Sequence, residues 1–327
     1  MSDQNVTLNV YNWGEYISDG SDGSLDTIHA FEDWYESTYG QKVKVNYSTY
    51  ASNEDLYAKL KSGAVSYDVI IPSDYMIARL KDEGMLQPLN FDNIPNYQHI
   101  HEGFQGLYYD PDNQYSVPYT YGVVGIIYDA NQVDPADAQG WDLMWNEKYA
   151  DDILMFDNSR DAIGIGLKML GYSYNTTDEN QIKEAVDLLV EQKPLVQAYV
   201  MDEVFGKMEG GNAAVGTYYY GDYLTMVENN PDLGFYIPEE GTNTYVDAMC
   251  ILKGAKNKEN AEAFINYMCS TEAGLKNCEE IWYSTPLMSV REELDPEVAN
   301  DPYAYPDEEI MDKCESYAGL PQNILDL

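Results

Sequence analysis

A strand followed by a helix recurs in the first third of the chain, and this alternation most limits the folds that the chain can adopt. Val6 to Tyr11 and Lys42 to Tyr47 alternate apolar with polar side chains, and Tyr67 to Ile71 is a continuous apolar run. Both patterns are typical of short strands. Strands that alternate with helices favour a parallel sheet covered by helices on both faces. The sequence therefore predicts an α/β fold.

The predicted helices between these strands have recognisable ends. One begins at Ser52, whose hydroxyl can accept hydrogen bonds from first-turn amides, and it ends at Gly63, which suits a left-handed helix terminus. Another runs from about Asp74 to Glu83 before Gly84. These local signals place a strand, a helix and a turn in regular succession.

The same succession returns in a later part of the chain, which predicts a second α/β lobe. Ile153 to Phe156 and Ala213 to Tyr218 are the predicted strands, followed by helices from about Ser159 to Leu170 and from near Asp222. A chain of 327 residues is long enough to bury two cores. The strand-like segments 117–119, 123–128 and 245–252 are the expected crossings. We expect lobe 1 to comprise residues 1–122 and 248–293, and lobe 2 residues 123–247 and 294–327.

The charge balance excludes one class of partner. Fifty-seven acidic and 18 basic residues give a formal net charge of −39, which repels phosphate backbones and anionic lipid surfaces. Nucleic acid is therefore not expected as a partner. The acidic excess would attract a polycation, but most carboxylates must form a solvated surface, because one site can use only a few of them.

The cysteines indicate no metal cofactor. The first residues leave the cellular compartment of the protein open. Four cysteines show neither a CxxC pair nor zinc spacing, so thiolate metal binding is not expected. Cys269 and Cys278 could pair in an exported protein. The start, Met1 to Gln4, has neither the basic nor the apolar part of a secretory leader, which fits a cytosolic protein or an exported product without its leader. No apolar run reaches the roughly 18 residues of a membrane span.

Aromatic and acidic residues follow the predicted strands at their carboxyl ends, where open parallel sheets bind ligands. They are accompanied by almost no cationic residues. The candidates are Trp13, Gly14, Glu15 and Tyr16; Ser73, Asp74 and Tyr75; Asp157, Asn158 and Asp161; Tyr218, Tyr219 and Tyr220; Tyr245 and Asp247; and Trp282 and Tyr283.

This set of residue types suits a ligand that has cationic ends and an aliphatic middle. An aromatic face attracts an ammonium by about 0.5 to 2 kcal/mol and also covers methylene groups. A carboxylate adds a directional, charge-assisted hydrogen bond of about 1.5 to 3 kcal/mol. With 31 tyrosines in the chain, single pairs of a tyrosine and an acid arise by chance, so the argument rests on the joint pattern.

Several motifs resemble the spermidine/putrescine-binding subunit of bacterial polyamine ABC importers. They occur in order along nearly the whole chain. They include Tyr11-Asn12-Trp13-Gly14-Glu15-Tyr16, Tyr47-Ser48-Thr49-Tyr50-Ala51-Ser52-Asn53-Glu54, Tyr67-Asp68-Val69-Ile70-Ile71-Pro72-Ser73, Ser116-Val117-Pro118-Tyr119, Val246-Asp247-Ala248, Ser284-Thr285-Pro286 and Pro296-Glu297-Val298-Ala299-Asn300-Asp301.

The resemblance implies a two-lobed type 2 periplasmic-binding-protein fold with mixed, mostly parallel sheets and a ligand cleft between the lobes. It also implies a polyamine ligand, permease subunits of an ABC transporter as partners, and a monomer. The expected location is the periplasm or the outer face of the cell membrane, with a lipid anchor in a Gram-positive organism. No catalytic residue is implied.

Residue by residue, the resemblance assigns a role to most of the candidates. Trp13 and Tyr245 match aromatics that sandwich the alkyl chain, and Asp247 matches the acid that binds an amine. The further cleft aromatics are Tyr75, Tyr219 and Tyr283, and the polar rim positions are Ser73 and Glu15.

Some positions depart from the family pattern. Tyr219 and Tyr245 stand where well-known relatives have tryptophan, and Gly14 replaces a threonine. Asn158 replaces an acid, and Asp161 is one methylene shorter than the expected glutamate. These changes weaken charge recognition in the second lobe or move it to Asp157, so the preference for a diamine or a triamine stays open. The segment Glu315-Ser316-Tyr317 receives no role.

Three alternatives remain at this point. Paired carboxylates beside aromatics also describe a glycoside hydrolase, although the sequence has no nucleophile elbow, HExxH or P-loop. Consecutive tyrosines at 218–220 could bind ferric ion through phenolates. A sugar or osmolyte would use the aromatics, but it would leave Asp247 without a cation.

Overall fold

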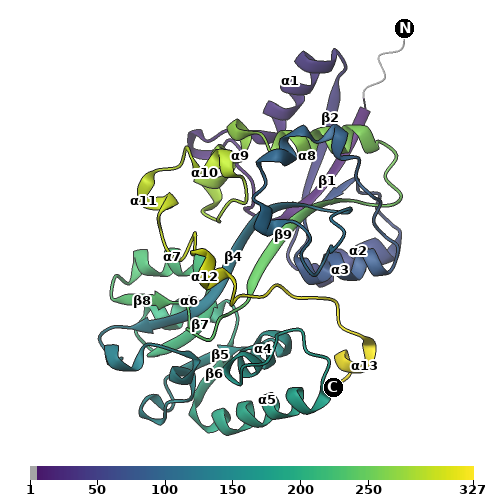
Figure 1. Cartoon of the computed structure of the whole chain (residues 1–327). Coiled ribbons are helices and arrows are strands. Elements are labelled where there is room, and N and C mark those ends of the chain that lie inside the picture. Colours follow the sequence, from purple (N-terminus) through teal and green to yellow (C-terminus); the bar gives the residue numbers. More distant parts are fainter. Residues whose placement is uncertain (1–5) are drawn as a thin grey trace. The chain divides into compact units, whose positions relative to one another are not determined.

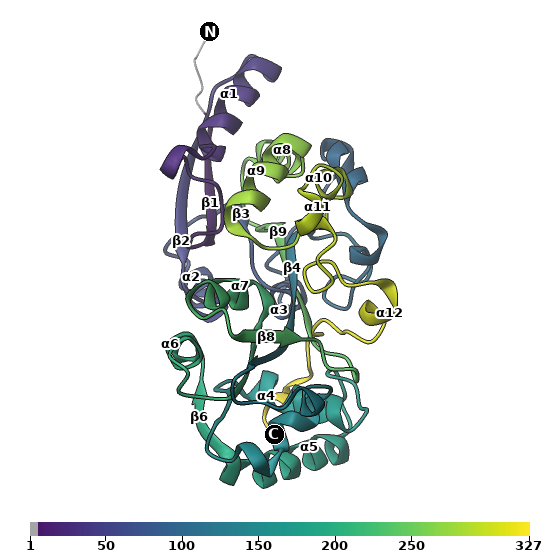
Figure 2. The same cartoon turned by 90° about the vertical axis from the view of Figure 1, so that its left-hand side faces the viewer.

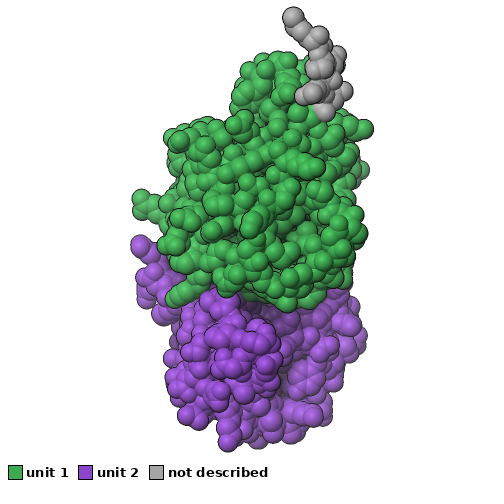
Figure 3. Space-filling view, turned by 90° about the vertical axis from the view of Figure 1, so that its right-hand side faces the viewer, with its two compact units in different colours: residues 1–121, 246–299 green, residues 122–245, 300–327 purple. Residues whose placement is uncertain are grey.

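A computed structural model describes residues 6–327, in which strands and helices alternate as predicted (Figure 1). The expectation about the leader falls on residues 1–4, outside the described part. By their internal contacts the residues form two compact units (Figure 3). Unit 1 comprises the described residues up to Tyr121 and Val246–Ala299, and unit 2 comprises Gly122–Tyr245 and Asn300–Leu327. Asp247, which the sequence placed in the second lobe, therefore groups with unit 1.

Unit 1 contains a mixed sheet in which the first three strands are parallel. Strand β1 (Val6–Trp13) lies between β2 (Val43–Tyr50) and β3 (Val69–Ile70), and β3 pairs antiparallel with β9 (Thr244–Ile251). Because β1, β2 and β3 are parallel, the residues that follow them gather at one edge of the sheet. This edge carries the segments after Trp13, Tyr50 and Ile70.

Helices cover the sheet of unit 1, and their ends follow the predicted signals. In α2, the Ser52 hydroxyl accepts a hydrogen bond from the amide of Asp55 at 3.0 Å, and Gly63 closes the helix with φ 67°. Helix α1 packs on β2 and on α8 (Figure 1). The helices are α1 (Thr27–Tyr39), α2 (Asn53–Ser62), α3 (Asp74–Asp82), α8 (Lys258–Met268), α9 (Thr271–Ile281), α10 (Met288–Arg291) and α11 (Pro296–Ala299).

The strands of unit 2 also form a mixed arrangement that includes three parallel strands. Strand β5 (Ile153–Phe156) pairs parallel with β6 (Val196–Val200) and with β7 (Val215–Tyr219). Strand β4 (Val117–Asp129) pairs antiparallel with β7 and with β8 (Leu233–Tyr236). The predicted segments 117–119 and 123–128 are thus one strand, which, like β9, runs from one unit into the other.

The helices of unit 2 follow the parallel strands, as expected of an α/β unit. Helices α4 and α5 lie side by side (Figure 2), and α6 packs on α7. The helices are α4 (Ser159–Met169), α5 (Glu179–Gln192), α6 (Glu203–Glu209), α7 (Tyr220–Asn229), α12 (Glu308–Met311) and α13 (Gln322–Leu325). Short 3₁₀ helices connect elements at Ser21–Gly23, Phe91–Asn93, Pro95–His99, Glu102–Phe104, Pro135–Asp137, Trp141–Trp145, Glu147–Tyr149 and Lys193–Leu195.

Each unit buries an apolar core of its own. In unit 2, Trp141, Met155 and Met208 are fully buried among the strands and helices. In unit 1, Phe31, Leu8 and Phe264 are fully buried. Within residues 6–327, no helix combines the length and the apolar character needed to cross a membrane.

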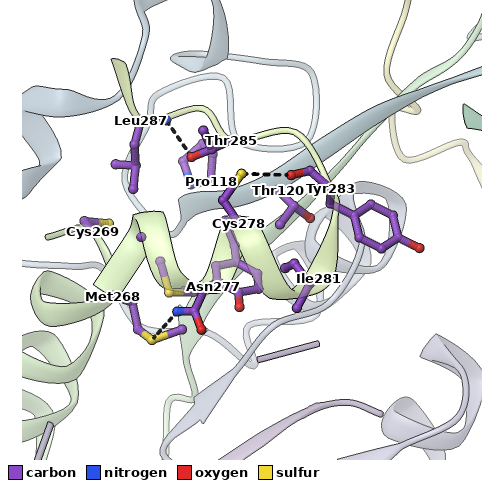
Figure 4. Close-up of a pocket in the computed structure, with 13 residues that line it drawn as sticks. Pro118, Thr120, Met268, Cys269, Asn277, Cys278, Ile281, Tyr283, Thr285 and Leu287 are labelled. Atoms are coloured by element: carbon purple, nitrogen blue, oxygen red, sulfur yellow. Dashed lines mark hydrogen bonds between the residues drawn. The ribbon is translucent and has the colours of Figure 1, made fainter. Parts of the chain in front are cut away.

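The suggested disulfide between Cys269 and Cys278 does not form. Both residues carry thiols and line the same small cavity of unit 1, about 10 Å³ in volume, roughly the room of one water molecule (Figure 4). The Cys278 thiol instead donates to the carbonyl of Tyr283 at 3.4 Å. Burial raises the pKa of both Cys250 and Cys269, so these two thiols stay protonated near neutral pH.

Candidate functional site

Asp247 is a buried carboxylate in unit 1 with one oxygen atom available. Strand β9 places it beside Ser73, with which it forms an isolated antiparallel bridge, and its side chain is 6% exposed. The Tyr16 hydroxyl donates to its Oδ2 at 2.6 Å. Within residues 6–327, its Oδ1 atom accepts no hydrogen bond. A buried acceptor without a donor is costly, so this atom is suited to an external donor.

The surroundings of Asp247 favour a cationic donor over a neutral one. Burial raises the pKa of Asp247 to about 6, while the side chains of Tyr16 and Ser73 lower it. The other ionisable groups close to it are Tyr50 and Tyr119, whose hydroxyls stay neutral because burial raises their pKa values. Burial disfavours the ionised form of Asp247, and a neighbouring ammonium would stabilise that form.

Tyrosine rings surround this carboxylate within unit 1. The Tyr16 ring lies 5.3 Å from that of Tyr119 and 5.2 Å from that of Tyr283, in edge-to-face geometry. The Tyr16 hydroxyl also contacts the Thr120 hydroxyl. Tyr283 (Figure 4) follows α9. Trp282 ends this helix in a left-handed conformation with φ 65°. Segments distant in sequence thus supply one aromatic enclosure.

The residues after β1 lie at the same sheet edge of unit 1. Trp13 is half-buried, and its indole Nε1 donates to the Ile71 carbonyl at 2.8 Å, which fixes the ring beside Tyr50 at 4.7 Å. Gly14 and Glu15 are exposed, and Glu15 turns the chain with φ 54°. Trp13 therefore offers a fixed aromatic face, while Glu15 is a solvated charge.

The three candidates at the start of α3 have different hydrogen-bond partners. The Ser73 amide donates to Asn53 Oδ1 at 3.1 Å. Asp74 is buried and its carboxylate accepts from the amides of Tyr75, at 2.7 Å, and of Val246, at 3.3 Å. The Tyr75 hydroxyl donates to a glutamate, Glu54, at 2.9 Å. The Asp74 carboxylate thus ties α3 to β9, which makes it a positioning group.

In unit 2, two half-buried tyrosines form an aromatic corner. The rings of Tyr219, at the end of β7, and Tyr245, at the start of β9, lie 5.1 Å apart and nearly perpendicular. Phe156 packs on Tyr219 at 5.7 Å. A Cβ atom at Gly122 would lie 2.4 Å from the Tyr245 hydroxyl oxygen, so this glycine makes room for the ring.

The three acidic or amide candidates after β5 lie in different environments. Asp157 and Asn158 are exposed, and Asn158 caps α4 by accepting from the Asp161 amide at 3.1 Å. Asp161 is buried, and burial raises its pKa to about 6 although the Tyr317 hydrogen bond and Arg160 lower it. The chain itself thus supplies a hydrogen-bond donor and a cation to this buried acid of unit 2.

Two acids of unit 2 lie at the carboxyl ends of its parallel strands but were not among the candidates from the sequence. Asp222 lies in the first turn of α7, directly after Tyr219, and burial together with Asp202 raises its pKa to about 7. Asp202 follows β6 and accepts from the Tyr218 hydroxyl at 3.1 Å. Their position after parallel strands was the available signal, since β5, β6 and β7 end at the same edge.

The predicted candidates therefore form two groups, each described within its own unit. Unit 1 brings Asp247 together with Tyr16, Tyr283 and Ser73. Unit 2 brings Tyr219 together with Tyr245. Neither group includes the exposed residues Gly14, Glu15 and Asp157. The Asp74 carboxylate accepts hydrogen bonds from backbone amides.

The tyrosines at 218–220 do not favour the ferric-ion alternative. Tyr218 and Tyr220 donate their hydroxyls to two different carboxylates, Asp202 and Asp301. Burial and Asp301 raise the pKa of Tyr220, which disfavours the phenolate that iron requires. Among residues 6–327, no cluster of three histidine, cysteine or acidic side chains is placed to hold a metal ion.

Known solute-binding proteins are similar to this chain over nearly its full length. The family model for bacterial extracellular solute-binding proteins matches residues 65–314. The spermidine/putrescine-binding periplasmic protein of Escherichia coli is 34% identical over 313 residues, which cover 95% of this chain and 86% of that protein. The putrescine-binding periplasmic protein of Pseudomonas aeruginosa is 29% identical over 341 residues, 97% of this chain and 88% of that one.

A solved structure agrees in fold as well as in sequence. The spermidine/putrescine ABC transporter substrate-binding protein of Streptococcus pneumoniae, crystallised with calcium and HEPES, has a TM-score of 0.87 and 37% identity. The similarity covers 98% of this chain and 96% of that one. The chain belongs to the family of bacterial extracellular solute-binding proteins.

Proposed function

We propose that this protein captures spermidine or putrescine outside the cytoplasm and delivers it to the permease subunits of an ABC importer. The observation that carries the proposal is Asp247, a buried carboxylate enclosed by tyrosine rings, whose Oδ1 accepts no hydrogen bond within residues 6–327. The relatives named above as spermidine- or putrescine-binding proteins support it. They are also named as binding proteins, which favours transport over catalysis.

The proposed contacts divide between the two units. Asp247 binds one ammonium, and Trp13, Tyr16 and Tyr283 cover the adjoining methylene groups. Tyr219 and Tyr245 cover the other part of the ligand. We take the units to be the two lobes of the fold, and one chain carries both sets of contacts, so the monomer is sufficient. The periplasm, or the outer face of a Gram-positive membrane with a lipid anchor, is the proposed location.

Calorimetric titration with putrescine, spermidine, spermine and a neutral sugar tests this function. We expect heat and a saturable isotherm with at least one of the amines and none with the sugar. Binding of the sugar alone would instead support the sugar or osmolyte alternative. Absence of heat and of any thermal shift with all three amines would overturn the proposal.

The affinity for polyamine is expected to fall with pH below neutrality. The folded, ligand-free carboxyl of Asp247 has a pKa of about 6, and an ammonium binds its ionised form. The protonated fraction rises as pH falls through 6, so the affinity at pH 5 should be about tenfold weaker than at pH 7.5. Titrations at both pH values measure this change, and titration in buffers of different ionisation enthalpy detects the proton released on binding near pH 6.

The variant Asp247→Asn is the control for this pH dependence. Asp161 and Asp222, with pKa values of about 6 and about 7, titrate in the same range, so part of the dependence could belong to them. We expect Asp247→Asn to lose most of it. An equally steep pH profile in the variant would assign the titration to another acid.

Replacing Asn158 by Asp should tighten polyamine binding modestly. Asp caps a helix as well as Asn does, so α4 is preserved, and the new carboxylate adds charge to unit 2. Because the position is exposed, we expect a gain of about two- to fivefold in affinity, the range of exposed ion pairs. Asn180→Asp, on the exposed face of α5, adds the same charge as a matched control. Equal affinities of Asn158→Asp and the parent would refute a charge role for this position.

A further inference from the structure

The C-terminal segment of unit 2 is fixed in place by the backbone. The Glu315 amide donates to the Thr242 carbonyl at 3.0 Å, and the Thr244 amide donates to the Glu315 carbonyl at 2.9 Å. The Glu315 side chain forms a mostly buried ion pair with Lys168, with Nζ 2.9 Å from Oε1. Residue 317 is therefore held in a defined position and does not depend on a mobile tail.

The next residues are anchored through one asparagine. The Asn175 side chain accepts from the Ala318 amide at 2.8 Å and donates to the Ser316 carbonyl, also at 2.8 Å. These two bonds bracket Tyr317 on both sides. The direction of its side chain is thus set by the fold of unit 2.

Tyr317 points at Asp161. It is buried, and its hydroxyl donates to Asp161 Oδ1. The Arg160 guanidinium lies over the Tyr317 ring at 4.4 Å, and its Nη2 atom donates to the Ala318 carbonyl at 3.1 Å. Tyr174 is the other ionisable neighbour, and its hydroxyl stays neutral. Asp161 therefore already has a hydrogen-bond donor and a neighbouring cation from its own chain.

This arrangement differs from that at Asp247 in its neighbouring charge. Both acids are buried and each accepts a tyrosine hydroxyl at one oxygen, but Arg160 lowers the pKa of Asp161, whereas no cation of the described chain acts on that of Asp247. The Oδ1 atom of Asp247 accepts no hydrogen bond within residues 6–327. An ammonium that took the place of Tyr317 at Asp161 Oδ1 would do so at the cost of a charge-assisted hydrogen bond and of buried aromatic area, and it would meet the Arg160 cation.

From these contacts we infer that Tyr317 is a specificity-determining residue that takes the place of a ligand ammonium at Asp161. The inference rests on the proposed polyamine-binding function and deepens it. One ammonium is bound by the carboxylate of Asp247, whereas unit 2 recognises the rest of the ligand by its aromatic corner and its exposed charges. Asp161 then makes little direct contribution to affinity as long as Tyr317 is present.

A double-mutant cycle over Asp161→Asn and Tyr317→Ser tests this inference by calorimetry with putrescine and spermidine. In the parent background, we expect Asp161→Asn to change either dissociation constant by less than about threefold, because no ligand bond to Asp161 is lost. Tyr317→Ser opens space and uncovers the carboxylate. In that background, Asp161→Asn should weaken spermidine binding by about tenfold, the value of one charge-assisted bond.

The outcomes separate this inference from the function itself. A parent that binds no amine refutes both. If the parent binds and Asp161→Asn alone weakens binding by as much as Asp247→Asn does, the ligand reaches Asp161 despite Tyr317, and only the inference fails. Equal effects of Asp161→Asn in both backgrounds would also overturn it.

Folding and net charge are controlled separately. Asp187→Asn removes one charge from the exposed face of α5 and should leave both dissociation constants unchanged. Thermal unfolding of each variant shows whether it is folded at the titration temperature. If Tyr317→Ser does not fold, the comparison of Asp161→Asn with Asp247→Asn in the parent background still decides the question.

Discussion

Asp247→Asn is expected to weaken polyamine binding by roughly ten- to 150-fold, which corresponds to the loss of about 1.5 to 3 kcal/mol for one charge-assisted hydrogen bond. Asparagine keeps the shape of the side chain and can still accept from Tyr16, so the enclosure of tyrosine rings is retained. What disappears is the negative charge that an ammonium would neutralise. Calorimetric titration with spermidine and putrescine at pH 7.5 measures the difference.

Loss of stability is not expected to explain that result. Because burial raises the folded-state pKa of Asp247 from its ordinary value of 3.8 to about 6, the ligand-free protein loses stability as pH rises between these two values. At pH 7.5 the unliganded Asp247→Asn protein should thus be no less stable than the parent. Asp82→Asn, on the exposed end of α3, controls for the change in net charge. Dissociation constants of Asp247→Asn equal to those of the parent would remove Asp247 from the proposed site.

Gly241→Ala should destabilise the protein strongly. Gly241 has φ 95°, and a Cβ atom there would lie 2.1 Å from the carbonyl oxygen of Lys313. Backbone strain and a steric clash with main-chain atoms each cost about 1 to 3 kcal/mol, so we expect a loss on the order of 3 kcal/mol in the free energy of unfolding. Chemical denaturation followed by fluorescence measures this loss.

Gly171→Ala separates the two contributions. Gly171 also has a positive φ, 82°, but no described heavy atom lies within 4 Å of a Cβ atom built there. This variant should lose only the conformational part, about 1 to 2 kcal/mol. Equal losses in the free energy of unfolding of the two variants would show that the C-terminal segment at Lys313 can shift away from the added Cβ atom without loss of stability. The comparison therefore also tests how firmly the segment that carries Tyr317 is held.

In the proposed function, the placement of charge matters more than its amount. A formal net charge of −39 attracts polycations from a distance, but the buried acids decide what is bound. Of these, Asp74 is occupied by backbone amides and Asp161 by Tyr317, whereas Asp247 retains an available oxygen atom. Recognition of the amine in this proposal thus depends on a single buried acid, supported by aromatic rings.

The elements that the sequence determined are those governed by local interactions. The helix from Asn53 to Ser62 has the predicted cap at Ser52 and the predicted left-handed end at Gly63, because a cap joins residues only a few positions apart. Strand Ile153–Phe156 has the predicted bounds. The α/β alternation and the gathering of acidic and aromatic residues after the strands followed from the same short-range patterns.

Only the tertiary structure decided which side chains surround each of the candidate acids. Tyr16 meets Asp247 across 231 residues, and Tyr317 meets Asp161 across 156 residues. Periodicity and capping report nothing about such contacts, because hydrogen-bond partners and desolvation depend on chain segments brought together by folding. The sequence could therefore name Asp161 and Asp247 as candidates but not their partners Tyr317 and Tyr16, and Tyr317 lies in a segment to which the sequence assigned no role.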